Sequence, residues 1–236
     1  PRELGGIPLD ELGATGFGLV HACEVAAARA GFPLAGARVV VQGLGSVGLH
    51  AARFLAQRGA VLVAASDSRG ALQDPKGLDL EALAAHKRSG GSAADAPVGR
   101  PLDPADLVGV ECEIWIPAAR PDVIREDNAP RLRTRLVVAG ANIPTTVGAE
   151  RWLHAHGILN VPDFIANAGG VICASMEYHG ASQGAAFEAI AERIRANTEE
   201  VLRESERRGV LPREAAVDLA ASRVRRAMGW RRWSVF

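Results

Sequence analysis

Short apolar runs alternate with stretches of helical spacing through the middle of the chain. Runs rich in β-branched side chains predict buried strands at 37–42, 60–66, 113–116, 136–139 and 158–161. Amphipathic spacing predicts helices at 46–58, 79–88 and 145–156, and turn-forming residues predict loops at 67–78 and 89–105. Strands that alternate with helices predict an α/β fold: a Rossmann-like, doubly wound and mostly parallel sheet, covered on both faces.

The two ends of the chain follow other patterns. Glycines are frequent in residues 1–18 and predict a loop or hinge, after which an Ala-rich stretch predicts a helix at 19–30. Residues 183–207 have the apolar stripe of a long amphipathic helix. Pro212 is placed to open a final helix, because the first helical turn tolerates proline.

Composition and charge exclude several classes of protein. The net formal charge is zero, so no overall positive charge favours nucleic acid or an anionic membrane surface. No apolar run approaches the ~20 residues of a membrane span. Cys23, Cys112 and Cys173 are widely spaced and odd in number, which predicts reduced thiols in a cytoplasmic protein. Neither these cysteines nor the histidines have metal-ligand spacing, so we expect no metal site.

A glycine-rich turn after the first predicted strand is the strongest chemical signal. Residues 43–48 read Gly-Leu-Gly-Ser-Val-Gly, and Asp67 follows the next strand at roughly the 20-residue spacing of a dinucleotide-binding fingerprint. Gly43 permits the sharp turn, Gly45 lets a pyrophosphate approach the main chain, and Gly48 lets the helix lie close to the strand. The alternative is an α/β crossover whose glycines serve packing alone.

Small residues and Asn also follow three later strands. The segments are 117–119, 140–146 and 162–171. Each taken singly fits ordinary turn chemistry, because Asn, Gly and Pro all favour turns. Three in succession at the strand ends of one sheet favour contact with a flat cofactor, since ligands of such sheets bind beyond the carboxyl ends of the strands.

These segments, in this order, resemble the C-terminal domain of the glutamate/leucine/phenylalanine/valine dehydrogenases. The resemblance covers nearly the whole chain and rests on residues 14–18, 43–48, 66–70, 112–119, 140–146 and 162–171. It implies oxidative deamination of an L-amino acid to a 2-oxo acid and ammonium, with a nicotinamide cofactor, in homo-oligomers that are often hexamers. It divides the chain into a hinge loop and leading helix (1–34), a dinucleotide-binding core (35–180) and C-terminal helices packing on the core (181–236).

The resemblance assigns the cofactor-binding residues position by position. The pyrophosphate turn takes in Gly43, Leu44, Gly45, Ser46 and Val47, with Ser46 in place of an Asn common there. Asp67 and Ser68 match the adenosine-ribose position. Ala118, Ala119 and Asn142 are expected to line the nicotinamide ribose. Thr15 matches the residue near the nicotinamide carboxamide.

The substrate side carries the departures from the family. Asn167 and the turn at 169–171 are expected at the junction of cofactor and substrate, with Gly170, Val171 and Ala174 as substrate-binding residues. Ala174 stands where glutamate-specific members have a Ser, although an adjacent alignment frame places Ser175 there. If Ala174 is the match, an apolar substrate is favoured over glutamate, because a methyl group cannot hydrogen-bond a carboxylate. Phe17 replaces a common Arg, and Ile143 replaces a common Gly.

The resemblance implies no catalytic residue within this chain. The family's catalytic lysines and aspartate belong to an N-terminal domain that none of these residues matches, and Lys76 and Lys87 are expected in a loop and a surface helix away from the cleft. We therefore expect the chain to bind cofactor without turning over substrate alone. Two alternatives stay open: a non-catalytic regulatory subunit that binds nucleotide or amino acid, and a dehydrogenase for a folate or shikimate-type substrate.

The choice between NAD and NADP depends on two side chains in one loop. The carboxylate of Asp67 favours NAD, because it can bond the ribose hydroxyls and repels a 2′-phosphate. Arg69 favours NADP, because a guanidinium binds phosphate well. We expect NAD, with NADP as the alternative.

Overall fold

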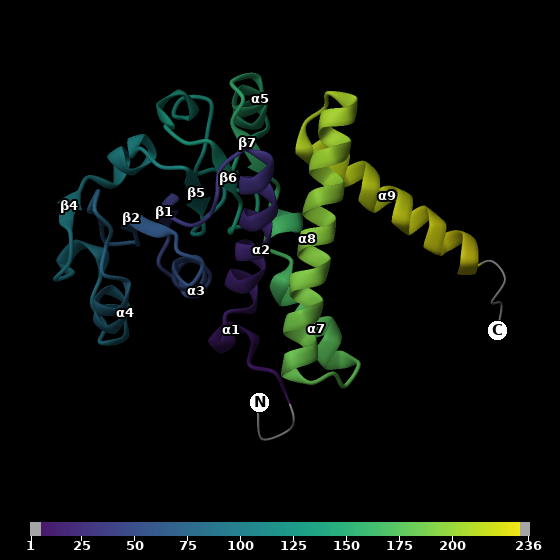
Figure 1. The fold of residues 1–236 in the computed structure, drawn as a ribbon, viewed down its shortest axis with the longest axis horizontal. Helices are drawn as coiled ribbons and strands as arrows, with labels where there is room; N and C mark the ends of the chain where they lie inside the picture. The colour runs from purple at the N-terminus through teal and green to yellow at the C-terminus, as the bar shows by residue number, and fades with distance from the viewer. Residues whose placement is uncertain (1–5, 232–236) are drawn as a thin grey trace.

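A seven-stranded sheet forms the centre of the molecule (Figure 1). The computed structural model describes residues 6–231. The strands are β1 (Arg38–Gln42), β2 (Val61–Ser66), β3 (Ala71–Gln73), β4 (Arg100–Leu102), β5 (Ile114–Pro117), β6 (Leu136–Val138) and β7 (Leu159–Val161). Their order across the sheet is β4-β3-β2-β1-β5-β6-β7, and the five from β2 to β7 run parallel. The predicted α/β, Rossmann-like, mostly parallel sheet is confirmed.

Helices cover both faces of this sheet. They are α1 (Leu9–Leu12), α2 (Ala14–Arg29), α3 (Ser46–Ala56), α4 (Leu80–Arg88), α5 (Val147–Ala155), α6 (Asp163–Ala166), α7 (Gly169–Tyr178), α8 (Gln183–Arg208) and α9 (Pro212–Arg231). Val39 and Val41 face the core shared with α2, α3 and α8. Val40 faces the second core, which contains Trp115 and Leu153. The three central residues of β1, 39–41, are all apolar because both faces of the strand are buried there.

The N-terminal region is more helical than expected. Residues 1–5 of the predicted loop lie outside the described residues, but α2 already begins at Ala14 rather than near residue 19. A Cβ on Gly16 would lie 2.7 Å from the backbone of Ala51, and one on Gly18 would lie 3.2 Å from Gly169. These glycines therefore serve close contact between helices, whereas the prediction took them for the flexibility of a loop.

Two segments predicted as loops contain the antiparallel edge of the sheet. Strand β3 lies within 67–78 and β4 within 89–105, and each is three residues long. Strand β3 pairs with both β2 and β4. Pro101 in β4 is tolerated because β4 is the outermost strand and needs hydrogen bonds on one side only. Strands of only three residues leave no alternating pattern to detect.

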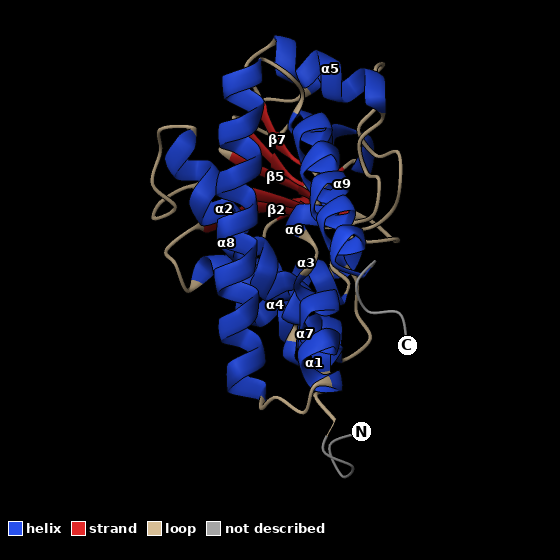
Figure 2. Cartoon of the chain, turned by 90° about the vertical axis from the view of Figure 1, so that its right-hand side faces the viewer, coloured by secondary structure: helices blue, strands red, loops and turns tan. Residues whose placement is uncertain are grey.

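The C-terminal helices extend beyond the sheet. Figures 1 and 2 show α8 running past the sheet toward α7 and α1, and Figure 1 shows α9 pointing away from the body. The predicted helices at 183–207 and from Pro212 are confirmed within one or a few residues. Among residues 6–231, no helix is both long and apolar enough to cross a membrane.

The packing of α8 on α2 and α7 allows a direct test of the core. Ile194 lies in α8 and is fully buried. Its replacement by Ala is expected to lower the free energy of unfolding by about 2–5 kcal/mol, because the lost methylenes leave a cavity. Val217→Ala is the control, since Val217 is 51% exposed on α9 and should change stability by less than ~0.5 kcal/mol. Urea denaturation measures both, and an equal effect of the two variants would contradict the placement of α8.

Candidate nucleotide-binding site

The glycine turn joins the end of β1 to the start of α3. Gly43 has a φ of +102°, which favours glycine, and the N–H groups of Gly43 and Leu44 both donate to the Ser66 carbonyl over 2.9 Å. A Cβ on Gly48 would lie 1.9 Å from the Gly43 carbonyl oxygen. Nothing lies within 4 Å of a Cβ placed on Gly45. Gly43 and Gly48 are therefore required by the fold, whereas Gly45 leaves space above the turn.

The first turn of α3 is open to a ligand. Gly45 is its N-cap residue and supplies no side-chain hydrogen bond, so the first N–H groups of the helix keep their donors available. Gly45 and Ser46 are both exposed. The Ser46 hydroxyl donates to the Asp10 carbonyl over 3.1 Å, so α1 lies beside the turn. Such a helix N-terminus suits a phosphate, because its dipole and N–H groups favour negative charge.

The turn opens on a cavity of about 1060 Å³ at the carboxyl ends of β1, β2 and β5. Seven predicted cofactor-binding residues line this cavity: Gly43, Leu44, Gly45, Asp67, Ser68, Ala118 and Ala119. Three parallel strands thus end at one hollow that holds the glycine turn, the acid and the small residues after β5. This is the place where open α/β sheets bind their ligands.

Asp67 is held by four donors at the edge of this cavity. Its Oδ1 accepts from the N–H groups of Arg69 at 2.9 Å and Gly70 at 3.2 Å. Its Oδ2 accepts from the Ala93 N–H at 2.9 Å and from Lys87 Nζ at 2.5 Å. The prediction that Lys87 lies away from the cleft is therefore wrong, because Lys87 reaches from α4 to Asp67 and lines the cavity.

These contacts determine the charge state of Asp67. Its side chain is 8% exposed, and burial alone raises the pKa of a carboxyl group. Hydrogen bonds from Lys87 and from the Arg69 and Ala93 N–H groups outweigh burial, so the pKa of Asp67 lies below its ordinary value. The carboxylate remains charged at neutral pH, but the neighbouring ammonium offsets that charge.

The side-chain amides of two predicted cofactor-binding residues meet in the segments that follow β6 and β7. Asn167 Nδ2 donates to Asn142 Oδ1 over 2.8 Å, although neither residue lines the cavity. A Cβ on Gly140, in the same loop as Asn142, would lie 3.1 Å from Ala118 Cβ, so this loop adjoins the cavity wall. Ile143, where the family often has Gly, has a φ of +48°. The backbone here has the conformation that the common glycine would adopt without strain.

The predicted substrate residues lie on α7. Residues 169–171, expected as a turn, form the first turn of this helix. A Cβ on Gly170 would lie 2.9 Å from Thr15 Oγ1, so the predicted carboxamide and substrate residues are neighbours. Val171 is 75% exposed, and Ala174 one helical turn later is also exposed. The two form part of an uncovered apolar face of α7.

Phe17 has a packing role. Its ring lies 5.3 Å from that of Phe54 and 4.8 Å from that of Phe187, so it joins α2 to α3 and α8. The replacement of a common Arg by Phe is explained by this aromatic cluster. It gives no separate support to a regulatory subunit.

Four cationic residues of the cavity wall escaped the sequence reasoning: Lys87, Arg120, Arg125 and Arg131. Arg125 pairs with Asp127, whereas Arg120, just beyond β5, has no side-chain partner among residues 6–231. Arg120 directly follows Ala118 and Ala119, and this adjacency is a signal that the sequence offered. Lys87 had no such signal, because its approach to Asp67 depends on how α4 folds back.

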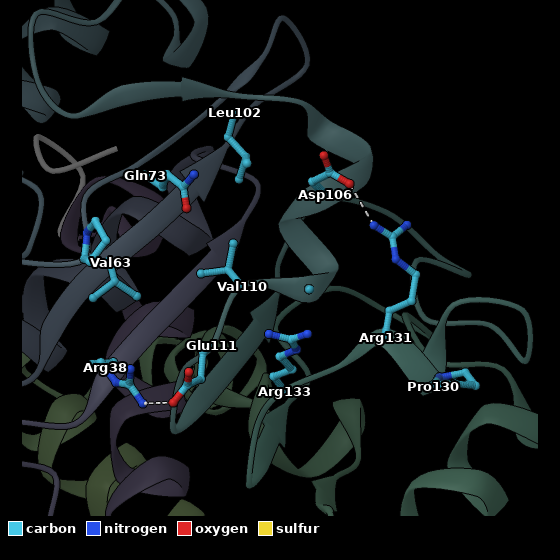
Figure 3. Close-up of a pocket in the computed structure, with 12 residues that line it drawn as sticks. Arg38, Val63, Gln73, Leu102, Asp106, Val110, Glu111, Pro130, Arg131 and Arg133 are labelled. Carbon is cyan, nitrogen blue, oxygen red and sulfur yellow. Dashed lines mark hydrogen bonds and ion pairs between the residues drawn. The ribbon is translucent and has the colours of Figure 1, made fainter.

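A second hollow of about 730 Å³ lies elsewhere on the sheet (Figure 3). Two of its arginines are paired, Arg38 with Glu111 at 3.0 Å and Arg131 with Asp106 at 2.8 Å. Arg133 has no ion pair with any described residue. One unpaired cation without convergent donors is a poor ligand site, which favours the cavity at the glycine turn. The described residues also contain no group of His, Cys, Asp and Glu that could hold a metal ion.

Comparison with known sequences identifies similar proteins of one family. Residues 5–232 match the family described as Glutamate/Leucine/Phenylalanine/Valine dehydrogenase. A glutamate dehydrogenase of Aeropyrum pernix is 38% identical over 99% of this chain and 58% of its own length. An NAD-specific glutamate dehydrogenase of Staphylococcus aureus is 36% identical over 94% and 55%. An NADP-specific one of Saccharolobus shibatae is 36% identical over 78% and 43%. The chain thus spans about half the length of these relatives, from 43% to 58%.

A solved structure agrees as well. The hetero-hexameric glutamate dehydrogenase from Thermus thermophilus, in a leucine-bound form, aligns with a TM-score of 0.85 and 32% identity. The alignment covers 100% of this chain and 56% of that one. The chain therefore belongs to the glutamate/leucine/phenylalanine/valine dehydrogenase family.

Proposed function

We propose that this chain is the nucleotide-binding part of an NAD(P)-dependent amino-acid dehydrogenase, which oxidatively deaminates an L-amino acid to a 2-oxo acid and ammonium. One observation carries the proposal: the glycine turn and the open N-terminus of α3 face a cavity at the carboxyl ends of three parallel strands. The space above Gly45 fits a pyrophosphate, since a Cβ there would meet no atom within 4 Å.

The residues of this chain bind and orient the cofactor. The N–H groups at the start of α3 would hold the pyrophosphate, and the Asp67 region would hold the adenosine ribose. Asn142, Asn167 and Thr15 would receive the nicotinamide end, beyond Ala118 and Ala119. The bound nicotinamide supplies hydride transfer with the substrate α-carbon. None of the described residues is assigned to proton transfer, so we expect the chain alone to have no dehydrogenase activity.

The substrate side is proposed from α7. Val171 and Ala174 present apolar surface beside Gly170 and Thr15. An apolar surface favours a branched or apolar amino acid, whereas the glutamate dehydrogenase relatives favour glutamate. Both stay candidates, because Ser175, the residue of the adjacent frame, is exposed on the same helix.

Other features of the chain support proposals on its cellular compartment and its oligomeric state. The three cysteines are buried and unpaired, which supports a reducing, cytoplasmic compartment. The apolar side chains left exposed on α7 and α9, such as Tyr178, Val224 and Met228, support assembly into oligomers, and we propose a hexamer of the full protein.

Paired calorimetric titrations of the purified chain with NADH and NADPH test the function. We expect saturable binding at one site per chain. Absence of binding by either cofactor would contradict the proposal. Formation of NADH from an amino acid by the chain alone, at an ordinary enzyme rate, would instead contradict the expected lack of activity.

A further inference from the structure

Arg213, in the first turn of α9, joins two buried carboxylates. Its Nε lies 2.8 Å and 3.0 Å from the two carboxylate oxygens of Glu150 on α5. Its Nη2 lies 2.9 Å from Asp163 Oδ1 on α6. Glu150 is 3% exposed and Asp163 is 6% exposed. A guanidinium suits this place, because its planar fork of donors can hold two carboxylates in a fixed geometry.

The second oxygen of Asp163 holds the loop after β6. The Ile143 N–H donates to Asp163 Oδ2 over 2.8 Å. Ile143 has a φ of +48°, and a β-branched residue keeps such a conformation only where the surrounding contacts impose it. The preceding residue, Asn142, accepts the hydrogen bond from Asn167. A continuous chain of polar contacts thus runs from α9 through Asp163 to the paired amides.

We propose that Arg213 is a positioning residue, which acts through Asp163 to hold Asn142 and Asn167 where the nicotinamide end of the cofactor binds. This inference rests on the proposed function, since that function places the nicotinamide at these amides. Arg213 does not line the cavity, so its effect reaches the cofactor only through the loop. If Arg213 merely neutralised Glu150, its loss would lower stability without distinguishing the two ends of the cofactor.

Two arginines of α9 provide a matched comparison. Arg223 also pairs with a carboxylate, Glu200 at 2.7 Å, but both of its partners lie on α8. Arg213→Met is expected to weaken NADH binding about tenfold while ADP, which lacks the nicotinamide end, binds within about twofold of wild type. Arg223→Met is expected to leave both affinities unchanged. Calorimetric titrations of the four combinations measure this.

A second readout needs no cofactor. Amide hydrogen exchange at Ile143 is expected to be faster in Arg213→Met than in the wild type and in Arg223→Met. If Arg213→Met does not fold, Arg213→Lys serves instead, because it keeps the charge between the carboxylates but cannot hold both at once. We expect it to speed the exchange at Ile143 and to weaken NADH binding by a smaller factor.

The outcomes separate the two proposals. An equal loss of NADH and ADP affinity, or unchanged exchange at Ile143, would overturn the positioning role. Failure of the wild-type chain to bind NADH would overturn the proposed function, and the exchange comparison would still decide whether Arg213 holds the loop.

Discussion

Replacing Gly45 with Ala is expected to weaken NADH binding by about tenfold or more and to leave the free energy of unfolding within ~0.5 kcal/mol of wild type. Gly45 has φ −83° and ψ −165°, a conformation that Ala adopts readily. No atom lies within 4 Å of the added methyl group. The methyl would instead occupy the space through which a pyrophosphate approaches the backbone. Calorimetric titration with NADH and urea denaturation measure the two quantities.

Gly48→Ala is the matched control for this substitution. Its Cβ would lie 1.9 Å from the Gly43 carbonyl oxygen and 2.9 Å from Val41 Cγ1, so α3 must shift away from β1. We expect a loss of stability of about 1–3 kcal/mol, as for overpacking in a core. If Gly45→Ala bound NADH as tightly as wild type, the pyrophosphate would not approach the backbone at Gly45, and the proposed site would be wrong.

The contrast between these glycines shows how far sequence reasoning reaches. The motif at 43–48 could be interpreted because strand, turn and helix are consecutive, and β1, α3 and β2 lie where the pattern placed them. The roles of Gly16 and Gly18 could not be interpreted from the sequence, because their close contacts are with α3 and α7, which follow later in the chain. A glycine that permits helix packing and one that permits a loop look the same until the packing partner is known.

The residues of the candidate site also fall into those that the sequence located and those that it missed. Residues at strand ends were located by the sequence, because a parallel sheet brings all carboxyl ends to one edge. Lys87 and Arg213 were missed because their partners lie on other elements: Lys87 reaches Asp67 only when α4 folds back, and Arg213 reaches Glu150 only when α9 begins beside α5. Charged residues on helices are usually solvated, so the pattern alone favours the wrong interpretation.

Lys87→Met is expected to weaken NADPH binding about tenfold and NADH binding by less than about threefold. Asp67 already accepts four hydrogen bonds, so its carboxylate has little capacity left for a ribose hydroxyl. The Lys87 ammonium lines the cavity and offsets the charge that would repel a 2′-phosphate. Without Lys87, Asp67 carries an uncompensated negative charge at the adenosine ribose. Titrations of wild type and variant with both cofactors give the change in preference.

Lys76→Met is the control for this substitution. Lys76 is exposed in the loop after β3, and only its backbone N–H makes a described hydrogen bond, to Asp74. We expect it to leave both affinities unchanged. An equal loss of NADH and NADPH affinity in Lys87→Met would show that the ammonium supports the loop without selecting the cofactor.

The same substitution should change the dependence of stability on pH. The pKa of Asp67 is lowered in the folded chain, so the stabilising contribution is present above the unfolded pKa of about 3.9 and is lost as pH falls through the folded pKa. Lys87→Met removes a large part of that contribution, at a cost of about 1–3 kcal/mol near pH 7, because a carboxylate that is 8% exposed loses its cation. The difference in unfolding free energy between wild type and Lys87→Met should therefore be largest near neutral pH and shrink below pH ~4. Urea denaturation across this range measures it, and a difference independent of pH would mean that the lysine contributes by packing rather than by its charge.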